Sequence, residues 1–395
     1  MRITGRSLWL IYIALTVLAQ MGCKPSAQNS NQANTSGPPK PVKVGKWVNQ
    51  FRSPASLPYS GTHLALFSYS SISVVSPEVV FVAGDVPNVP KNENERIGVV
   101  VRTTDGGKTW TEFFIKQPGM KITTLNGVHF VNPNLGWVVG IDSKGGGVVL
   151  KTTDAGANWT VSQLNFKQQP TAVYFADEHT GWMGGATALA DDEEEIGGPS
   201  DILATTDGGA TWYPQRRVPT SINKFTFIDK QTGWAGGHKG AIYHTEDGGR
   251  TWNAQKSELE VSEGPLHQTP EGHLMFSIQG IHFVDRENGF AAASSQTGDD
   301  KGRMLKTTNG GQSWARTWIV EDSGVQDVFF LTPMIGWAAT ERGRYIYYSE
   351  DGGKYWNAEV VDFEQNVPVL RIAAADAAHV WAVGGGGIFV RVVEE

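Results

Sequence analysis

An eight-residue motif that recurs six times constrains the fold of this chain more than any other feature. It reads Ser/Thr-x-Asp/Asn-x-Gly-x-x-Trp, and its copies begin at Thr103, Thr152, Thr205, Thr245, Thr307 and Ser349. A short carboxylate or amide can accept hydrogen bonds from nearby backbone N–H groups and close a tight turn. Glycine supplies the positive φ that a tight hairpin needs. Six copies in one chain predict a repeat architecture built from hairpins.

The recurring carboxylates of this motif, the Asp box, are expected to be structural and not catalytic. One copy carries an amide in the same position, and a role that tolerates an amide is hydrogen bonding, not acid–base chemistry. The Trp that ends each box is expected to cover its hairpin, with its N–H on a carbonyl. The expected structural residues are Asp105, Asp154, Asp207, Asp247, Asn309 and Asp351 with Trp110, Trp159, Trp212, Trp252, Trp314 and Trp356.

A second motif alternates with the boxes and completes a unit of four strands. Residues 128–140, VHFVNPNLGWVVG, read as an alternating strand, a polar turn and a strand that opens with Gly-Trp, and four relatives follow. Residues 72–84 begin the first unit, and residues 369–393 supply three strands of a last one. Its fourth strand is found at the other end of the chain, where residues 44–50 carry Gly-x-Trp.

These units predict an all-β fold, a seven-bladed β-propeller of four-stranded antiparallel blades over residues 42–395. Six blades are continuous in sequence. The last is shared between residues 44–50 and 369–393, so that the N-terminal strand pairs with the C-terminal strands and closes the ring. Closure removes the unpaired edge and the uncovered apolar face that an open array would leave.

The alternation of F-x-(D/N)-x-x-x-G-W-x-x-G with L-x-T-T-D-G-G-x-T-W resembles the photosystem II stability/assembly factor family. The resemblance covers nearly all of the chain after residue 41, whereas the box alone is also found in sialidases, xyloglucanases and sortilin-type receptors. It implies a non-enzymatic propeller, of a kind widespread in bacterial envelope proteins, that holds partner proteins during assembly. The basic patch of the family's plant and cyanobacterial members has no matching motif in this sequence.

The N-terminus indicates export. Arg2 and Arg6 precede an apolar run over residues 8–18 that is short for a membrane span, so residues 1–22 are expected to be a signal peptide. Cys23 is the single cysteine and follows at once, which predicts lipidation, with simple secretion as the alternative. Residues 23–41 are expected to be a flexible tether. We therefore expect a lipid-anchored protein of the cell envelope, on the periplasmic side.

Charge and motifs exclude several classes of function. The formal net charge is −7, and loss of Arg2 and Arg6 with a signal peptide would make it two units more negative, so nucleic acid is not an expected partner. The sequence carries no EF-hand spacing, zinc-binding His pair or phosphate-binding glycine loop, so neither metal nor cofactor is expected. We expect a monomer.

The long insertions are all expected on the face opposite the boxes, where a partner protein could bind. They cover residues 85–97, 186–200, 257–277 and 294–302. The candidate partner-binding residues in them are Asn92, Glu95, Asp191, Glu194, His267, Asp299 and Asp300.

The expected function is a non-catalytic scaffold that binds protein partners, as an assembly or stability factor does. One alternative is a glycoside hydrolase acting on extracellular glycans, because Phe51-Arg52-Ser53-Pro54 resembles the Phe-Arg-Ile-Pro of sialidases. Three arginines, or two facing carboxylates, would then converge at the mouth of the central channel. A further alternative is a module that binds carbohydrate or a small ligand without turnover.

Overall fold

The computed structural model describes most of the chain from residue 45 onward, and residues from Lys43 form one compact unit. The described residues are 45–52, 68–88, 92–164, 168–187, 198–257, 259, 276–296, 301–320, 322–342, 344–362 and 368–393. Cys23 and the expected signal peptide and tether lie outside these ranges. No helix among the described residues is long and apolar enough to cross a membrane.

The described residues form twenty-eight strands and one short 3₁₀ helix, η1 (His238–Gly240). In chain order the strands are β1 (Lys46–Phe51), β2 (Ser68–Val74), β3 (Val80–Asn88), β4 (Asn92–Thr103), β5 (Thr111–Phe114), β6 (Ile122–Phe130), β7 (Gly136–Asp142), β8 (Gly147–Thr152), β9 (Thr160–Gln163), β10 (Gln168–Phe175), β11 (Gly181–Thr187), β12 (Ser200–Thr205), β13 (Tyr213–Val218), β14 (Ile222–Phe227), β15 (Gly233–Gly237), β16 (Ile242–Thr245), β17 (Asn253–Gln255), β18 (Phe276–Phe283), β19 (Gly289–Ser295), β20 (Gly302–Thr307), β21 (Ala315–Val320), β22 (Val325–Phe330), β23 (Gly336–Thr340), β24 (Tyr345–Ser349), β25 (Asn357–Asp362), β26 (Val369–Ala374), β27 (Val380–Gly384) and β28 (Gly387–Val392).

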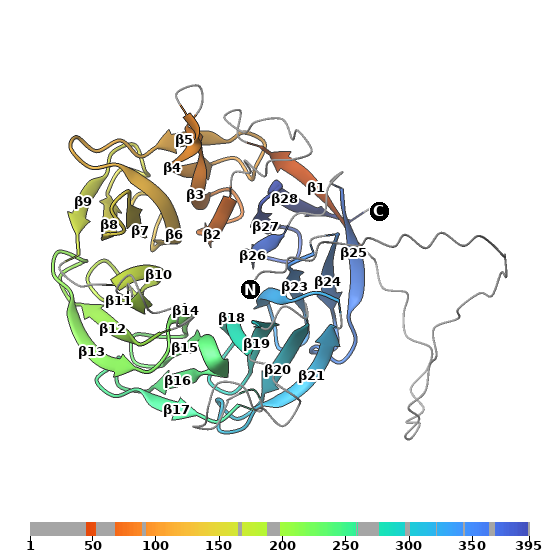
Figure 1. Cartoon of the computed structure of the whole chain (residues 1–395). Helices are drawn as coiled ribbons and strands as arrows, with labels where there is room; N and C mark the ends of the chain where they lie inside the picture. Colours follow the sequence, from red (N-terminus) through yellow and green to blue (C-terminus); the bar gives the residue numbers. More distant parts are fainter. Residues whose placement is uncertain are drawn as a thin grey trace, which may run out of the picture. The chain divides into compact units, whose positions relative to one another are not determined.

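The strands group into seven antiparallel blades that close into a ring (Figure 1). Blades one to five are β2–β5, β6–β9, β10–β13, β14–β17 and β18–β21, and blade six is β22–β25. Blade seven is β26, β27 and β28 with β1 as its outermost strand. The innermost strands contact one another in turn, and β26 contacts β2 again. The predicted seven-bladed propeller, closed by its N-terminal strand, is therefore confirmed.

Neighbouring blades are held together by stacked aromatic rings. The second strand of one blade presents a Trp or Phe that lies flat on a Phe of the next blade's innermost strand, as Trp137 does on Phe175 at 3.5 Å between ring centroids. The box Trp of that next blade, Trp212, meets the same Phe edge-on at 5.8 Å. Such pairs stabilise by about 0.5–1.5 kcal/mol beyond the burial of their area. Equivalent stacks join blades one and two, three and four, four and five, and five and six.

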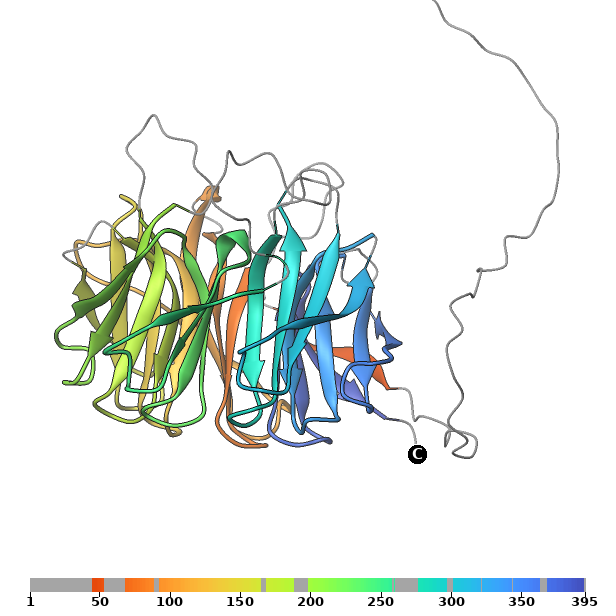
Figure 2. The same cartoon turned by 90° about the horizontal axis from the view of Figure 1, so that it is seen from below.

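The box hairpins cross-link each blade and its neighbour on one face of the ring. Within blade three, Gly208 N–H of the box donates to the carbonyl of His179, in the turn after the innermost strand, at 2.9 Å. The carbonyl of Gly208 in turn accepts from Trp137 Nε1 of blade two at 2.9 Å. The innermost-strand turns and the box turns therefore share a face, and the strands run from it to the opposite face (Figure 2).

The seam between blades six and seven is built differently, because β1 also pairs in parallel with β25, the outermost strand of blade six. The two blades therefore form one continuous eight-stranded sheet. Behind the seam, Glu359 of β25 and Arg391 of β28 form a buried ion pair, with Arg391 Nη2 at 2.5 Å from Glu359 Oε1. Glu359 also accepts from Gly45 N–H at 2.7 Å and from Trp47 Nε1 at 3.0 Å. One carboxylate thus joins β25, β28 and β1.

Candidate functional site

The central channel is lined by the innermost strands of all seven blades and encloses about 260 Å³. Each of these strands contains a β-bulge at the same place, where one extra residue is left out of the pairing with the second strand. A bulge re-aims the side chain of its extra residue. The extra residues are Ser70, Asn126, Thr171, Asn223, Gln279, Gln326 and Leu370.

These seven residues, here called the bulge ring, line a hollow of about 230 Å³ at one mouth of the channel. The innermost strands run from this mouth toward the face that carries the box turns. The bulge ring therefore opens on the opposite face, where the insertions leave the blades. Six of its seven side chains can hydrogen-bond, and Leu370 is the exception.

Four consecutive members of the bulge ring are tied to the next blade. Each side chain donates to the carbonyl of the residue that precedes the next bulge. The pairs are Ser70 with Leu125, Asn126 with Pro170, Thr171 with Ile222, and Asn223 with Ile278. This series of hydrogen bonds, here called the relay, stops at blade five, where no described residue hydrogen-bonds the Gln279 side chain. Gln326 Nε2 donates to Glu341 Oε2 at 3.4 Å, within its own blade. The amides of Gln279 and Gln326 therefore stand outside the relay at this side of the mouth.

The position after each bulge makes the channel asymmetric. Blades one, two, three and five place small residues there, whereas blades four, six and seven carry Lys224, Asp327 and Arg371. Lys224 forms an ion pair with the fully buried Asp327, whose other oxygen accepts from Ile372 N–H at 3.1 Å. A Cβ on Gly280 of blade five would lie 2.4 Å from Asp327 Oδ1, so glycine allows this carboxylate to reach past blade five.

Burial lowers the pKa of three basic groups in the channel, His129, His282 and Lys224. Burial lowers the pKa of His129 and of His282 to about 4, so both imidazoles are neutral at pH 7. His282 Nε2 lies 2.8 Å from the carbonyl of Phe330. Burial also lowers the pKa of Lys224, against the attraction of Asp327. The described lining contains one arginine and one carboxylate, Arg371 and Asp327.

Arg52, the residue that suggested a sialidase, lies immediately after β1, the outermost strand of blade seven, and is exposed. The channel is bounded by the innermost strands, so Arg52 is at the opposite edge of its blade from the channel.

The box residues form the same hydrogen-bonded turn in successive blades. In the first box, Thr103 Oγ1 accepts from Gly107 N–H at 2.8 Å and donates to Asp105 Oδ1 at 2.8 Å. Asp105 Oδ1 also accepts from Thr109 N–H at 2.9 Å, and Gly107 has φ +88°. Asn309 accepts from Ser313 N–H at 3.0 Å in the same way. Asp154, Asp207, Asp247 and Asp351 occupy the equivalent place.

The box Trp residues correct one expectation. Trp252 and Trp314 donate to the side chains of Gln215 and Gln255, and the indole N–H groups of the other four box Trp residues have no partner among the described residues. In blades two to six a box carbonyl is already bonded to a Trp, Gln, Lys or Arg of the preceding blade, such as Trp182 Nε1 on Gly248. The box Trp residues are Trp110, Trp159, Trp212, Trp252, Trp314 and Trp356.

Two box carboxylates, Asp105 and Asp207, are expected to stay ionised far into acid. Hydrogen bonds from the side chain and backbone of Thr109 lower the pKa of Asp105 to about 2, and those of Thr211 do the same for Asp207. A depressed pKa gives stability that is present above the unfolded value and is lost as pH falls through about 2. Carboxyl ¹³C NMR should show midpoints near this value, and Thr109→Val should raise that of Asp105. Midpoints near 4 in the wild type would contradict this.

The insertions differ from expectation in blade one. Residues 85–97 were expected to be a loop, but β3 and β4 stay paired out to Pro87 and Arg96, so most of this segment is strand. Arg96 Nε donates to the Asp85 carboxylate across this extension of the hairpin, and the ion pair stabilises it. Asn92 and Glu95 lie on β4. The other candidate partner residues, Asp191, Glu194, His267, Asp299 and Asp300, lie outside the described residues.

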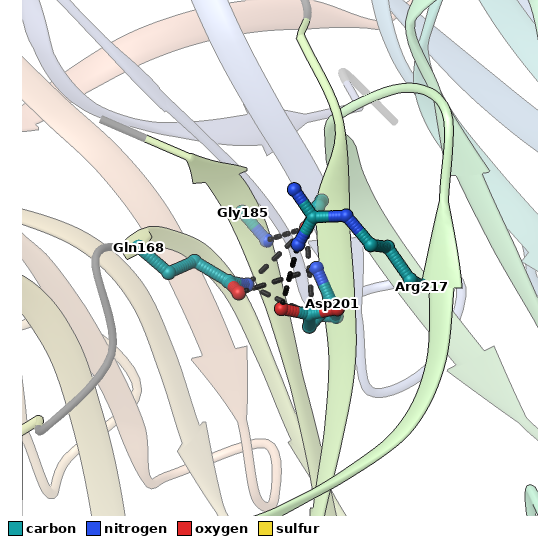
Figure 3. A network of polar contacts seen from close by, with 5 residues as sticks. Gln168, Gly185, Asp201 and Arg217 are labelled. Carbon is teal, nitrogen blue, oxygen red and sulfur yellow. Dashed lines mark hydrogen bonds and ion pairs between the residues drawn. The ribbon is translucent and has the colours of Figure 1, made fainter. Parts of the chain in front are cut away.

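The base of the acidic insertion in blade three is clamped by a polar network (Figure 3). Gln168 Nε2 donates to Asp201 O at 2.9 Å and to Ser200 Oγ at 3.2 Å. Arg217 Nη1 donates to Asp201 Oδ2 at 3.1 Å. Ser200 begins β12, and β11 ends at Thr187, so this network fixes the strand to which the insertion returns.

Sequence reasoning missed the bulge ring, although the innermost strands carry a signal for it. A regular strand buries alternate residues, whereas these strands place buried side chains three apart, as at Leu125 and Val128 or Val325 and Val328. A spacing of three within a strand indicates an inserted residue. The polar residue after the first apolar one is then the bulge residue.

Comparison with known proteins agrees with these motifs. Residues 123–280 match the model of a family described as photosynthesis system II assembly factor YCF48. The chain is 26% identical over 167 residues to the photosystem II assembly lipoprotein Ycf48 of Synechococcus sp. (strain CC9902). It is 24% identical over 210 residues to the chloroplastic photosystem II stability/assembly factor HCF136 of Oryza sativa subsp. japonica. The matches cover 42% and 49% of this chain, and it spans about half the length of each relative, 44% and 48%.

A solved structure described as YCF48 bound to D1 peptide has the same fold. It superposes with a TM-score of 0.56 over 86% of this chain and 99% of the solved one, at 17% identity. The resemblance of this chain to the photosystem II stability/assembly factor-like propeller family is therefore confirmed.

Proposed function

We propose that this chain is an exported, lipid-tethered scaffold that holds a protein partner at the bulge-ring mouth of its channel and performs no chemistry. The observation that carries the proposal is the bulge ring, in which Gln279 and Gln326 stand outside the relay that ties the other polar members. An amide side chain offers both a donor and an acceptor, which matches a peptide group. One curated relative is named an assembly lipoprotein, and one solved relative is described as bound to a peptide.

Two features favour a binding role over turnover. Asp327, the carboxylate of the described lining, is already engaged by Lys224 and by the backbone of Ile372. The box carboxylates are likewise engaged by their own turns. Small residues at this position on blades one to three leave room in the channel, so a partner segment could enter beside the positive charge of Arg371.

Replacing both glutamines by leucine is expected to weaken partner capture about thirtyfold, since each lost hydrogen bond contributes about 1 kcal/mol. The test is capture by the full chain from native membranes, with the partner quantified by mass spectrometry for Gln279→Leu/Gln326→Leu. Gln312→Leu is the matched control, because Gln312 is exposed on a box turn at the other face. Equal recovery by the double variant and the control would overturn the proposed site.

A further inference from the structure

Exposed apolar side chains gather on the two blades that share the seam. Of the nine large apolar residues that are exposed among the described residues, six belong to blades six and seven. These six are Met334, Tyr345, Tyr355, Val360, Val392 and Val393. A patch concentrated on one part of a repeating ring indicates an interaction surface more than a property of the repeat.

Strand pairing places the central members of this group in one row across the outside of the seam. Tyr345 of β24 is paired with Val360 of β25, and Lys46 of β1 with Val392 of β28. The parallel pair Trp47 with Val361 puts Lys46 beside Val360. The row Tyr345–Val360–Lys46–Val392 thus crosses four neighbouring strands, and its three apolar members are 38%, 56% and 39% exposed. We call it the seam row.

The seam row is also where the chain enters the propeller. Lys46 is its third member, and Gly45 is the first described residue. Residues 24–44 separate Cys23 from Gly45, and a random coil of this length would have a root-mean-square span of about 25 Å. With an acylated Cys23, the seam row is therefore held close to the bilayer at a high effective concentration.

We propose that the seam row rests on the surface of the bilayer to which the chain is tethered, an inference that depends on the proposed lipid anchor. Valine and tyrosine side chains suit the headgroup boundary of a bilayer. A row of this size binds weakly alone and serves as the second of the two signals that stable anchoring needs. An added strand from another protein is disfavoured, because β1 is already paired with β28 and β25.

The test uses the full chain, acylated in bacterial cells and reconstituted in vesicles of phosphatidylethanolamine and phosphatidylglycerol. Acylation occupies Cys23, the single cysteine, so Val360→Cys or Tyr345→Cys gives one site for a spin label. Tyr213→Cys is the matched control, because Tyr213 is 42% exposed on the outermost strand of blade three. Labels at 360 and 345 are expected to lose collisions with an aqueous nickel complex severalfold on moving from detergent to vesicles, whereas the label at 213 keeps them.

Equal accessibility of all three labels in an acylated chain would overturn the seam row as a membrane contact and leave the anchor intact. Protection that appears only in native membranes, and not in the protein-free vesicles, would assign the row to a protein partner and also overturn the inference. A chain whose N-terminal peptide carries no acyl mass would refute the anchor itself, and the inference with it.

Discussion

Replacing Glu359 with alanine is expected to lower the free energy of unfolding by about 3–5 kcal/mol and to release the N-terminal strand. Glu359 is fully buried, and its two oxygens accept from Arg391, Trp47 and Gly45. Without it, Arg391 would remain buried and would lose the carboxylate to which its Nε and Nη2 donate, with its guanidinium 4.5 Å from the Tyr348 ring. Urea unfolding measures the loss, and limited proteolysis before residue 52 measures the release of β1.

Two variants separate the buried pair from a general effect of charge. Arg217→Ala removes an ion pair whose arginine is 57% exposed, and it should change stability by less than about 1 kcal/mol. Glu359→Leu combined with Arg391→Met replaces the pair by apolar groups of similar size and should recover most of the loss. If Glu359→Ala unfolds at the same urea concentration as Arg217→Ala, the closure of the ring does not depend on this carboxylate.

The blade count and the closure could be predicted because their signals are local. Box turns require glycine and a short acceptor side chain, and the aromatic residues that stack between blades recur at fixed positions. The Gly-x-Trp of residues 44–50 was enough to assign β1 to blade seven. The second pairing of β1, with β25, could not be predicted, because Glu359 in NAEVVD looks like a polar residue of an exposed strand. The burial of Glu359 depends on Arg391 and Gly45, which are distant from it in sequence.

The candidate site was harder to predict than the fold, because sequence reasoning looked for function in the insertions. Insertions are conspicuous as additions to a repeat, whereas the bulge ring is part of the repeat and varies only in residue type. Lys224, Asp327 and Arg371 stand at equivalent positions on different blades. Their meeting across the channel follows from the number of blades and from the glycine at position 280, so it is visible only once the ring is closed.

Replacing Asp327 with asparagine is expected to lower the free energy of unfolding by about 3 kcal/mol at pH 7, and less at higher pH. The variant keeps the shape of the side chain but leaves Lys224 charged beside Arg371 with no opposing charge. Burial already holds the pKa of Lys224 in the folded chain below its ordinary value in the unfolded chain. Between these two pKa values the folded chain therefore binds fewer protons than the unfolded chain. Stability therefore rises with pH in that interval.

Loss of the Asp327 charge should lower the pKa of Lys224 further and extend this rise toward neutral pH. Urea unfolding between pH 7 and pH 10 should therefore show a steeper increase for Asp327→Asn than for the wild type. Adding Lys224→Met to Asp327→Asn removes the titrating group and should abolish the extra slope. If the stability of the single variant and that of the wild type change with pH in parallel, the Asp327 carboxylate does not raise the pKa of Lys224.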